Sequence, residues 1–165
     1  MAHPKLQLVR ERYAYCCGYC GVSETDTGGE LTVDHFRPVS AGRDDSDENL
    51  VYACIRCNQH KGKFIPEATD TEQELHLLHP LQDNLTLHLY EDKRTGRLEG
   101  LTRTGIFHIE ALRLNRSALI AHRLRRRLFL FQEERMKQMV LENAALNEQL
   151  ERRDLYIVHL EERLK

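Results

Sequence analysis

The sequence predicts an α+β protein with a small cysteine-stapled core, an accessory β-hairpin and a long C-terminal helix. Three features lead to this prediction. Two Cys-x-x-Cys pairs frame a segment that passes from strand-forming to helix-forming residues. Leucines alternate with polar residues over 85–90, and a turn-rich stretch follows them. No glycine or proline occurs in residues 117–165, so one long helix can form there.

The length and charge of the chain suggest one domain with an appendage. The 165 residues are divided at the predicted start of the long helix, which gives a domain over 1–116 and a tail over 117–165. The formal net charge of −2 excludes a uniformly basic protein. Residues 24–48 nevertheless carry eight acidic side chains against two arginines, and residues 112–127 carry six arginines and no acid.

The expected location is cytoplasmic, with no membrane association. No apolar run approaches the roughly 20 residues that a membrane span needs. The first residues, MAHPKLQLVRERY, lack the apolar core of a secretory signal. Disulfides are unusual in the cytosol, so the cysteines are predicted to bind metal.

The predicted core is a strand–loop–strand–helix unit that follows a short amphipathic helix over 4–14. A strand over 31–36 leads into a turn-rich loop at 39–48, a second strand over 49–53 returns, and a helix runs over 54–63. A unit of this size does not fold unaided, because below roughly 40 residues a metal or another staple is usually needed.

The two cysteine pairs are predicted to supply that staple as one structural zinc site. The two-residue spacing lets both sulfurs of a pair bind one tetrahedral ion at about 2.3 Å, and four protein ligands leave no open position. A redox Cys-x-x-Cys is the competing interpretation, but it needs a βαβ context that is absent. The predicted ligands are Cys17, Cys20, Cys54 and Cys57. Cys16 is expected to be a small buried apolar residue.

Downstream of the core, the pattern predicts a hairpin and two helices. The strand over 85–90 buries one face and pairs with residues 98–101. A helix opens at Thr104 and breaks near Asn115, and another begins near Ser117.

The long helix carries a heptad pattern. Positions a hold Phe129, Met136, Asn143, Leu150, Ile157 and Leu164, and positions d hold Gln132, Met139, Leu146, Arg153 and Leu160. A lone asparagine at position a is typical of a dimeric coiled coil. Gln132 and Arg153 weaken the pattern, so packing against the chain's own domain and docking to a partner protein stay open.

The core motifs resemble the HNH endonuclease family, the ββα-metal or His-Me finger nucleases. The order matches over 17–63: a Cys-x-x-Cys, the pair Asp34-His35, a glycine-containing loop to Asn49, and a second Cys-x-x-Cys followed directly by Asn58. The resemblance extends less sharply to about residue 127. It implies that Asp34 binds a divalent ion, His35 takes a proton from water, and Asn49 orients the imidazole.

The third motif position departs from the family name, because Asn58 stands where histidine is implied. An asparagine oxygen is a weaker ligand than an imidazole, and it favours Mg²⁺ or Mn²⁺ as the catalytic ion. Lys61 shares the helical face of Asn58 and is predicted to contact a phosphate. Contacts with the nucleic-acid backbone are also predicted for Arg116, Arg123 and Arg127, which fall on one helical face.

The predicted function is metal-dependent hydrolysis of DNA phosphodiester bonds, with DNA favoured over RNA on family grounds alone. The predicted assembly is a homodimer formed through the long helix. One alternative is a catalytically silent zinc module that binds nucleic acid or a partner protein, which Asn58 favours. Another is a nuclease subunit that docks to an effector such as an ATPase, as in phage-defence or mobile-element systems.

Overall fold

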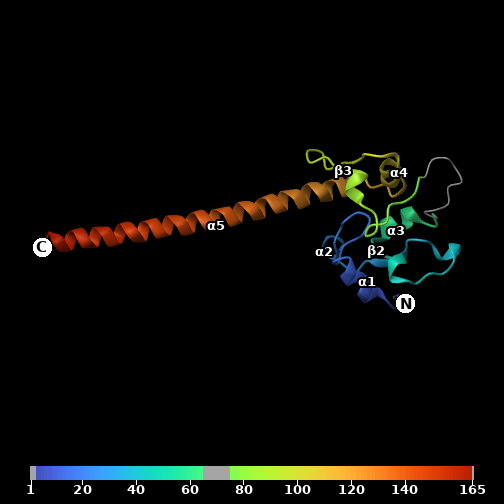
Figure 1. The fold of residues 1–165 in the computed structure, drawn as a ribbon, viewed down its shortest axis with the longest axis horizontal. Helices are drawn as coiled ribbons and strands as arrows, with labels where there is room; N and C mark the ends of the chain where they lie inside the picture. Colours follow the sequence, from blue (N-terminus) through green and yellow to red (C-terminus); the bar gives the residue numbers. More distant parts are fainter. Residues whose placement is uncertain (1–2, 65–74, 165) are drawn as a thin grey trace. The chain divides into compact units, whose positions relative to one another are not determined.

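The computed structural model describes residues 3–64 and 75–164 (Figure 1). The chain divides into two compact units, Met1–Leu124 and Arg125–Lys165. In chain order the helices and strands are α1 (Leu6–Arg12), α2 (Glu24–Thr27), β1 (Thr32–His35), β2 (Leu50–Ala53), α3 (Ile55–Lys61), β3 (Leu89–Glu91), β4 (Leu98–Gly100), α4 (Arg103–Ala111) and α5 (Ser117–Arg163). The predicted mixture of helices with small hairpins and a long C-terminal helix is confirmed.

The first hairpin and α3 form the predicted core unit. Strands β1 and β2 are antiparallel, and Asp34 lies opposite Val51 while His35 lies opposite Leu50. All four side chains of β2 are buried. Because successive strand residues point to opposite faces, the side chains of Asp34 and His35 lie on opposite sides of β1.

The hydrophobic core surrounds β2. Tyr52 and Leu50 are among its largest fully buried side chains. Helix α1 lies against this hairpin and buries Val9 in the same cluster. Full burial of a leucine or valine side chain stabilises a fold by about 1.5–3 kcal/mol, so apolar packing contributes strongly to holding the hairpin.

The second hairpin is shorter than predicted. Only residues from Leu89 pair as a strand, with β4, and residues 85–87 form a 3₁₀ turn instead. The side chain of Asn84 accepts hydrogen bonds from the backbone N–H of Thr86, at 3.3 Å, and from its hydroxyl, at 2.7 Å. This local bonding competes with strand pairing, and it leaves Leu87 exposed. The prediction of a strand over 85–90 was therefore wrong at its first half.

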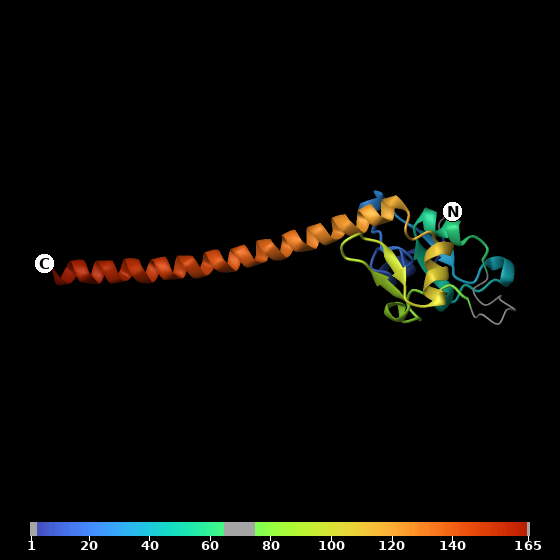
Figure 2. The same cartoon turned by 90° about the horizontal axis from the view of Figure 1, so that it is seen from above.

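Helix α4 packs closely on this hairpin (Figure 2). A Cβ atom on Gly105 would lie 2.0 Å from the backbone oxygen of His88, so only glycine permits this approach. Two backbone hydrogen bonds end the helix: the N–H of Leu114 donates to the oxygen of Ile109, and the N–H of Arg113 donates to the oxygen of Glu110. The turn that follows leads into α5.

The first turns of α5 belong to the first unit. Leu119 and His122 are buried there, and so is Arg123. The Arg123 guanidinium donates to the backbone oxygens of Gly96, at 2.9 Å, and Leu114, at 2.6 Å. This arginine therefore ties α5 to the β3–β4 hairpin and to the end of α4.

The second unit consists of α5 residues whose side chains are largely exposed. Apolar heptad residues are among them, including Met136, Leu150 and Ile157. In the part of the chain that the structure describes, no helix is both long enough and apolar enough to cross a membrane.

Candidate active site

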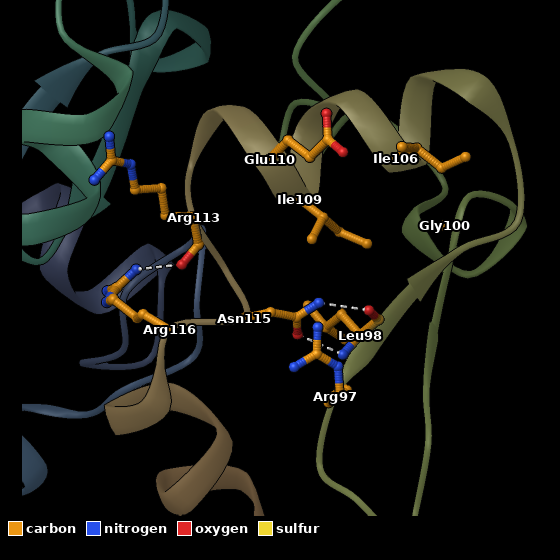
Figure 3. A pocket seen from close by; sticks show the side chains of 9 residues that line it. All are labelled: Arg97, Leu98, Gly100, Ile106, Ile109, Glu110, Arg113, Asn115 and Arg116. Atoms are coloured by element: carbon orange, nitrogen blue, oxygen red, sulfur yellow. Dashed lines mark hydrogen bonds between the residues drawn. The ribbon is translucent and has the colours of Figure 1, made fainter.

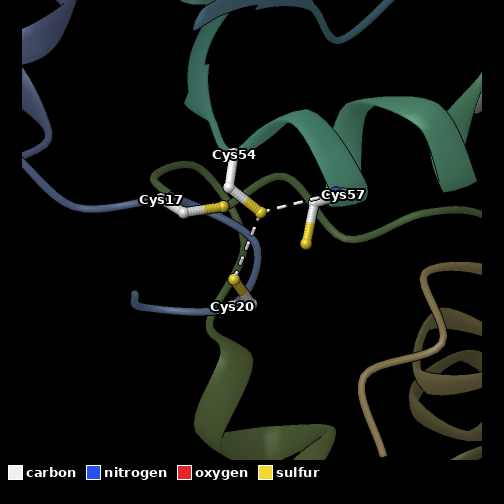
Figure 4. A group of neighbouring side chains, drawn as sticks. All are labelled: Cys17, Cys20, Cys54 and Cys57. Carbon is white, nitrogen blue, oxygen red and sulfur yellow. Dashed lines mark hydrogen bonds between the residues drawn. The ribbon is translucent and has the colours of Figure 1, made fainter. Parts of the chain in front are cut away.

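The four predicted zinc ligands come together between the first turns of the chain and α3 (Figure 4). Their sulfur atoms all lie within 4.8 Å of one another, and those of Cys20 and Cys54 are 3.8 Å apart. Four sulfurs at about 2.3 Å from one tetrahedral ion would lie roughly 3.8 Å from each other. The donor set and its spacing therefore fit a tetrathiolate zinc site.

Local backbone geometry sets this cluster in place. Ala14, at φ 48°, and Tyr15, at φ 62°, turn the chain sharply after α1, so Cys17 and Cys20 face the core. Cys54 is the N-cap of α3, and its sulfur accepts the backbone N–H of Cys57 at 3.4 Å. Cys16 is only half-buried, which corrects the expectation of a buried residue.

Arg116 adds a positive charge to the cysteine cluster. Its Nη2 lies 3.4 Å from Sγ of Cys57 and 3.9 Å from Sγ of Cys54, and its Nη1 donates to the backbone oxygen of Leu112 at 3.3 Å. A guanidinium in this position stabilises thiolates. To contact a phosphate as predicted, Arg116 would have to give up its contacts with the cysteine sulfurs.

His35 stands at the end of β1 with a side chain that is 18% exposed. Its Nε2 lies 2.7 Å from Oδ1 of Asp45, in the loop between the two strands. The hydrogen bond with His35 and a second one from Arg43 lower the pKa of Asp45 to about 2. Asp45 is therefore a carboxylate at neutral pH, and it holds one face of the imidazole.

His3 approaches the same carboxylate from the N-terminal segment. Its Nε2 lies 3.8 Å from Oδ1 of Asp45, and its ring meets that of His35 edge-on with centroids 5.6 Å apart. His3, His35 and Asp45 offer three ligand atoms within 4.8 Å. The Nδ1 of His3, however, accepts the backbone N–H of Lys5 at 3.2 Å, so in the neutral ring the proton is on Nε2. A neutral ring with this tautomer has no free lone pair for a metal ion, and at 3.8 Å from Asp45 its Nε2 lies beyond hydrogen-bond distance.

Asp34 is buried on the opposite face of β1, and its side chain is 7% exposed. The hydroxyl of Tyr19 donates to Oδ2 at 2.7 Å, and Nζ of Lys61 donates to Oδ1 at 3.1 Å. Burial raises the pKa of Asp34, and the Lys61 charge opposes that shift. Both oxygens of the predicted metal ligand are thus engaged by protein groups.

Lys61 lies in the core and not on a phosphate-binding surface. Its side chain is fully buried, and its Nζ also donates to the backbone oxygen of His35 at 2.6 Å. This placement argues against the predicted phosphate contact. The sequence pattern did place Lys61 one helical turn from Asn58, but it could not show which side of α3 is covered.

Asn49 holds the loop and does not contact the imidazole. Its Oδ1 accepts the backbone N–H of Arg37 at 2.7 Å, and its Nδ2 donates to the backbone oxygens of Arg37, at 3.2 Å, and Asp44, at 2.8 Å. The predicted orienting role toward His35 is corrected accordingly. Asn49 positions the loop that carries Asp45, and Asp45 contacts the ring.

Asn58 is half-buried on α3, above the Asp34 face of β1. Its Nδ2 donates to the hydroxyl of Thr32 at 3.4 Å. Thr32 and Asp34 share one face of the strand because side chains repeat with a period of two. The predicted metal ligands Asp34 and Asn58 therefore face the same side, but each is already bonded to protein.

Residues 17–64 match the family model for HNH endonuclease. This segment is an HNH domain. The match confirms the resemblance over the stretch that contains both cysteine pairs, β1, β2 and α3. A search of curated proteins and a search of solved structures each returned no significant match.

The predicted arginine contacts lie outside the HNH domain and do not act together. Arg116 faces the cysteines, and Arg123 is buried in hydrogen bonds to backbone oxygens. Arg127 is partly exposed and belongs to the second unit. The helical spacing placed these side chains on one face of the helix, but it could not show that the first turns of that face are covered by the rest of the first unit.

Sequence reasoning missed two groups at the site. Asp45 is one of several acids in the loop of the HNH domain, and only the folded loop selects it as the partner of His35. Tyr19 lies between Cys17 and Cys20, and its hydroxyl donates a hydrogen bond to Asp34. Its position inside a Cys-x-x-Cys was the available signal, because such a residue must lie near the core.

Proposed function

We propose that the chain is an endonuclease that hydrolyses DNA phosphodiester bonds with a divalent ion and with His35 as general base. One observation carries this proposal: inside the matched HNH domain, His35 is partly exposed and its Nε2 is 2.7 Å from the Asp45 carboxylate. DNA is preferred to RNA on family grounds.

The pair has the arrangement of a histidine base with an orienting acid. Hydrogen bonding of Nε2–H to Asp45 fixes the tautomer and leaves the Nδ1 lone pair to accept a proton from water. The carboxylate also stabilises the imidazolium that forms, since opposite charges at this distance attract strongly. A positioned base of this kind contributes about 10²–10⁴-fold to a hydrolysis rate.

Two metal ions are proposed, one with a structural role and one with a catalytic role. Zinc at the four cysteines holds α3 against the N-terminal turns and supplies no open coordination position. The catalytic ion, Mg²⁺ or Mn²⁺, is proposed at Asp34 and Asn58 from the family resemblance. Those residues do not fit an ion as they stand, because Lys61 and Tyr19 bond both oxygens of Asp34. An ion at Asp34 would have to displace the Lys61 ammonium.

Plasmid nicking tests the proposal directly. The wild-type chain with Mg²⁺ or Mn²⁺ is expected to convert supercoiled plasmid to open circles, and His35→Ala is expected to lose this activity. His159→Ala is the matched control, because His159 is exposed on α5. Equal nicking by His35→Ala and wild type would refute the assignment of the base.

A catalytically silent zinc module is the second candidate, and the buried Asp34–Lys61 pair favours it. The two side chains satisfy one another at 3.1 Å with the help of Tyr19, which is a stable arrangement without any ion. Absence of nicking with either ion, together with retained nucleic-acid or protein binding, would select this candidate.

The proposed assembly is a homodimer through α5, and a partner-docking helix is the alternative. Exposed apolar side chains occupy several a and d positions, including Met136, Met139, Leu146, Leu150 and Ile157. Asn143 at an a position would then set the register of two strands. If α5 binds another protein instead, the chain is a nuclease subunit of a defence or mobile-element complex.

A further inference from the structure

A cleft lies outside the HNH domain, between β4, α4 and the turn that joins α4 to α5 (Figure 3). Its volume is about 540 Å³, and its lining is mainly apolar. Leu98, Ile106 and Ile109 form the apolar part, and Ile106 is 48% exposed. A concave apolar surface with a few polar groups is the usual form of a ligand site.

The polar lining of the cleft is mostly positive. Arg97, Arg113 and Arg116 line it together with one acid, Glu110. Arg97 and Arg113 are exposed, whereas Arg116 is half-buried against the cysteines. Guanidinium groups bind phosphate through paired N–H donors, and their flat faces also stack on bases. The charge therefore suits a ligand that combines phosphate with an apolar ring.

The cleft is preformed. The side chain of Asn115 donates to the backbone oxygen of Leu98 and accepts its N–H, each at 2.8 Å, which fixes β4 to the turn. A Cβ atom on Gly100 would lie 2.4 Å from the backbone N of Ile106, so the strand and α4 are in close contact. Little ordering is needed before a ligand binds.

Arg113 occupies a position that usually belongs to glycine. Its φ is 49°, and the bonds from Arg113 N–H to Glu110 and from Leu114 N–H to Ile109 form a Schellman motif. Side chains are disfavoured in this left-handed conformation. A strained residue of this kind points to a functional role for its side chain. Arg113 lines the edge of the cleft, and its side chain extends away from Leu98 and Ile106 (Figure 3), where its charge acts on His60 of α3.

The positive surface continues from the cleft to the helix of the HNH domain. Burial lowers the pKa of His60 on α3, and the charges of Arg116, Arg113 and Arg56 lower it further. Arg56 is exposed on the same helix. The arginines of the turn and of α3 thus create one positively charged region around His60.

We propose that this cleft binds an unpaired nucleotide of a nucleic-acid strand, with phosphates on Arg97 and Arg113 and the base against Leu98 and Ile106. The proposal rests on the nuclease function and specifies its substrate as single-stranded or locally unpaired DNA. An unpaired base is required because the faces of a paired base are covered by its neighbours in the stack.

The test measures binding in a protein that does not cut. Full-length, zinc-loaded His35→Ala chain is titrated against a fluorescein-labelled single strand and against the same sequence as a duplex, with anisotropy as the readout at several NaCl concentrations. We expect the single strand to bind more tightly. We expect Arg113→Gly to weaken that binding about tenfold and to reduce the salt dependence by about one phosphate contact.

Stability provides the second readout. Arg113→Gly relieves the left-handed strain, so its melting temperature is expected to equal or exceed that of the parent, and weak binding cannot then be ascribed to unfolding. Arg94→Gly is the control, since Arg94 is an exposed arginine of the hairpin turn that does not line the cleft. Ile106→Ser is expected to reduce the preference for the single strand.

Three results would overturn the proposal: equal binding by the Arg113→Gly and Arg94→Gly proteins, equal affinity for single strand and duplex, or an unchanged preference in Ile106→Ser. None of these readouts depends on cleavage. If the wild type does not nick DNA but the single strand still binds as expected, the nuclease function is rejected and the binding role of the cleft stands. If the wild type nicks DNA but the cleft variants bind the strand normally, the binding role of the cleft is rejected and the nuclease function stands.

Discussion

At the scale of single residues, the candidate chemistry is concentrated in one contact. His35 is held by a carboxylate that the HNH motif does not include, and the motif residue Asn49 acts one step away by bonding the loop backbone. Asp34, one position before His35, lies in a buried ion pair instead. Adjacent residues of one strand thus face an open and a closed environment, and only the open one offers a base to solvent.

Substitution of Asp45 tests that contact. Asp45→Asn keeps the size of the side chain but removes the charge that orients and stabilises protonated His35, so nicking is expected to fall about 100-fold. Asp44→Asn serves as the control, because asparagine still accepts the backbone N–H of Ser46 that Asp44 binds at 2.9 Å. Comparable activity in the two variants would contradict a positioning role for Asp45.

A buried histidine makes stability depend on pH. Burial lowers the pKa of His108 from 6.5 to about 4, and its Nδ1 accepts the backbone N–H of Leu78 at 3.1 Å. The unfolded chain binds the proton at higher pH than the folded chain, so stability is complete above about pH 6.5 and falls as the pH drops toward 4. The full loss is on the order of 3 kcal/mol.

Thermal unfolding between pH 4 and pH 7.5 measures this effect. His108→Gln retains an acceptor for the Leu78 N–H without a titrating ring, so its melting temperature should vary less over this range. His159→Gln removes an exposed histidine and should keep the wild-type slope. Parallel pH profiles for His108→Gln and wild type would show that His108 is not the group involved.

At the scale of elements, the cysteine cluster joins parts of the chain that are distant in sequence. It links the turn after α1 to the start of α3, and Arg116 brings the turn before α5 to the same sulfurs. The hairpin β1–β2 is short, with four residues in each strand, so the cysteine cluster and apolar packing together hold the HNH domain.

Zinc removal is therefore expected to unfold the HNH domain. A zinc chelator should lower the melting temperature strongly, and Cys20→Ser should do so without a chelator, because three sulfurs and a hydroxyl bind zinc poorly. Cys16→Ser is the matched control, because Cys16 is next to Cys17 in the sequence but does not belong to the cluster of four cysteines. Metal analysis should find one zinc per chain in this control. A stable, zinc-free wild-type protein would contradict the structural role.

At the scale of the whole molecule, the two units have different surfaces. The first has a buried core and the proposed site. The second consists of α5 from Arg125 onward, and many of its apolar residues are exposed. A helix with such a surface is stabilised by association, because an isolated helix gains little from its own backbone bonds.

Sedimentation of the full chain tests the proposed dimer. Leu150→Lys places a charge at a heptad a position and is expected to dissociate a dimer to monomers. Leu155→Lys is the control, since Leu155 lies off the a and d positions and is equally a leucine of exposed α5. A wild-type monomer, or identical behaviour of the two variants, would reject self-association and favour a partner protein.

The sequence by itself determined the elements whose signals are local. The cysteine spacing predicted the cysteine cluster, the order of the motif residues predicted the HNH domain, and the absence of helix breakers after residue 116 predicted α5. These features depend on neighbours in the chain, so spacing is enough to reveal them.

Only the tertiary structure decided which side chains are free to act. It paired His35 with Asp45, closed Asp34 against Lys61 and Tyr19, and buried Arg123. It also opened a cationic cleft that no motif marks. The reason is physical: whether a charged group meets water, a counter-ion or a ligand depends on the segments packed around it, and those segments are distant in sequence.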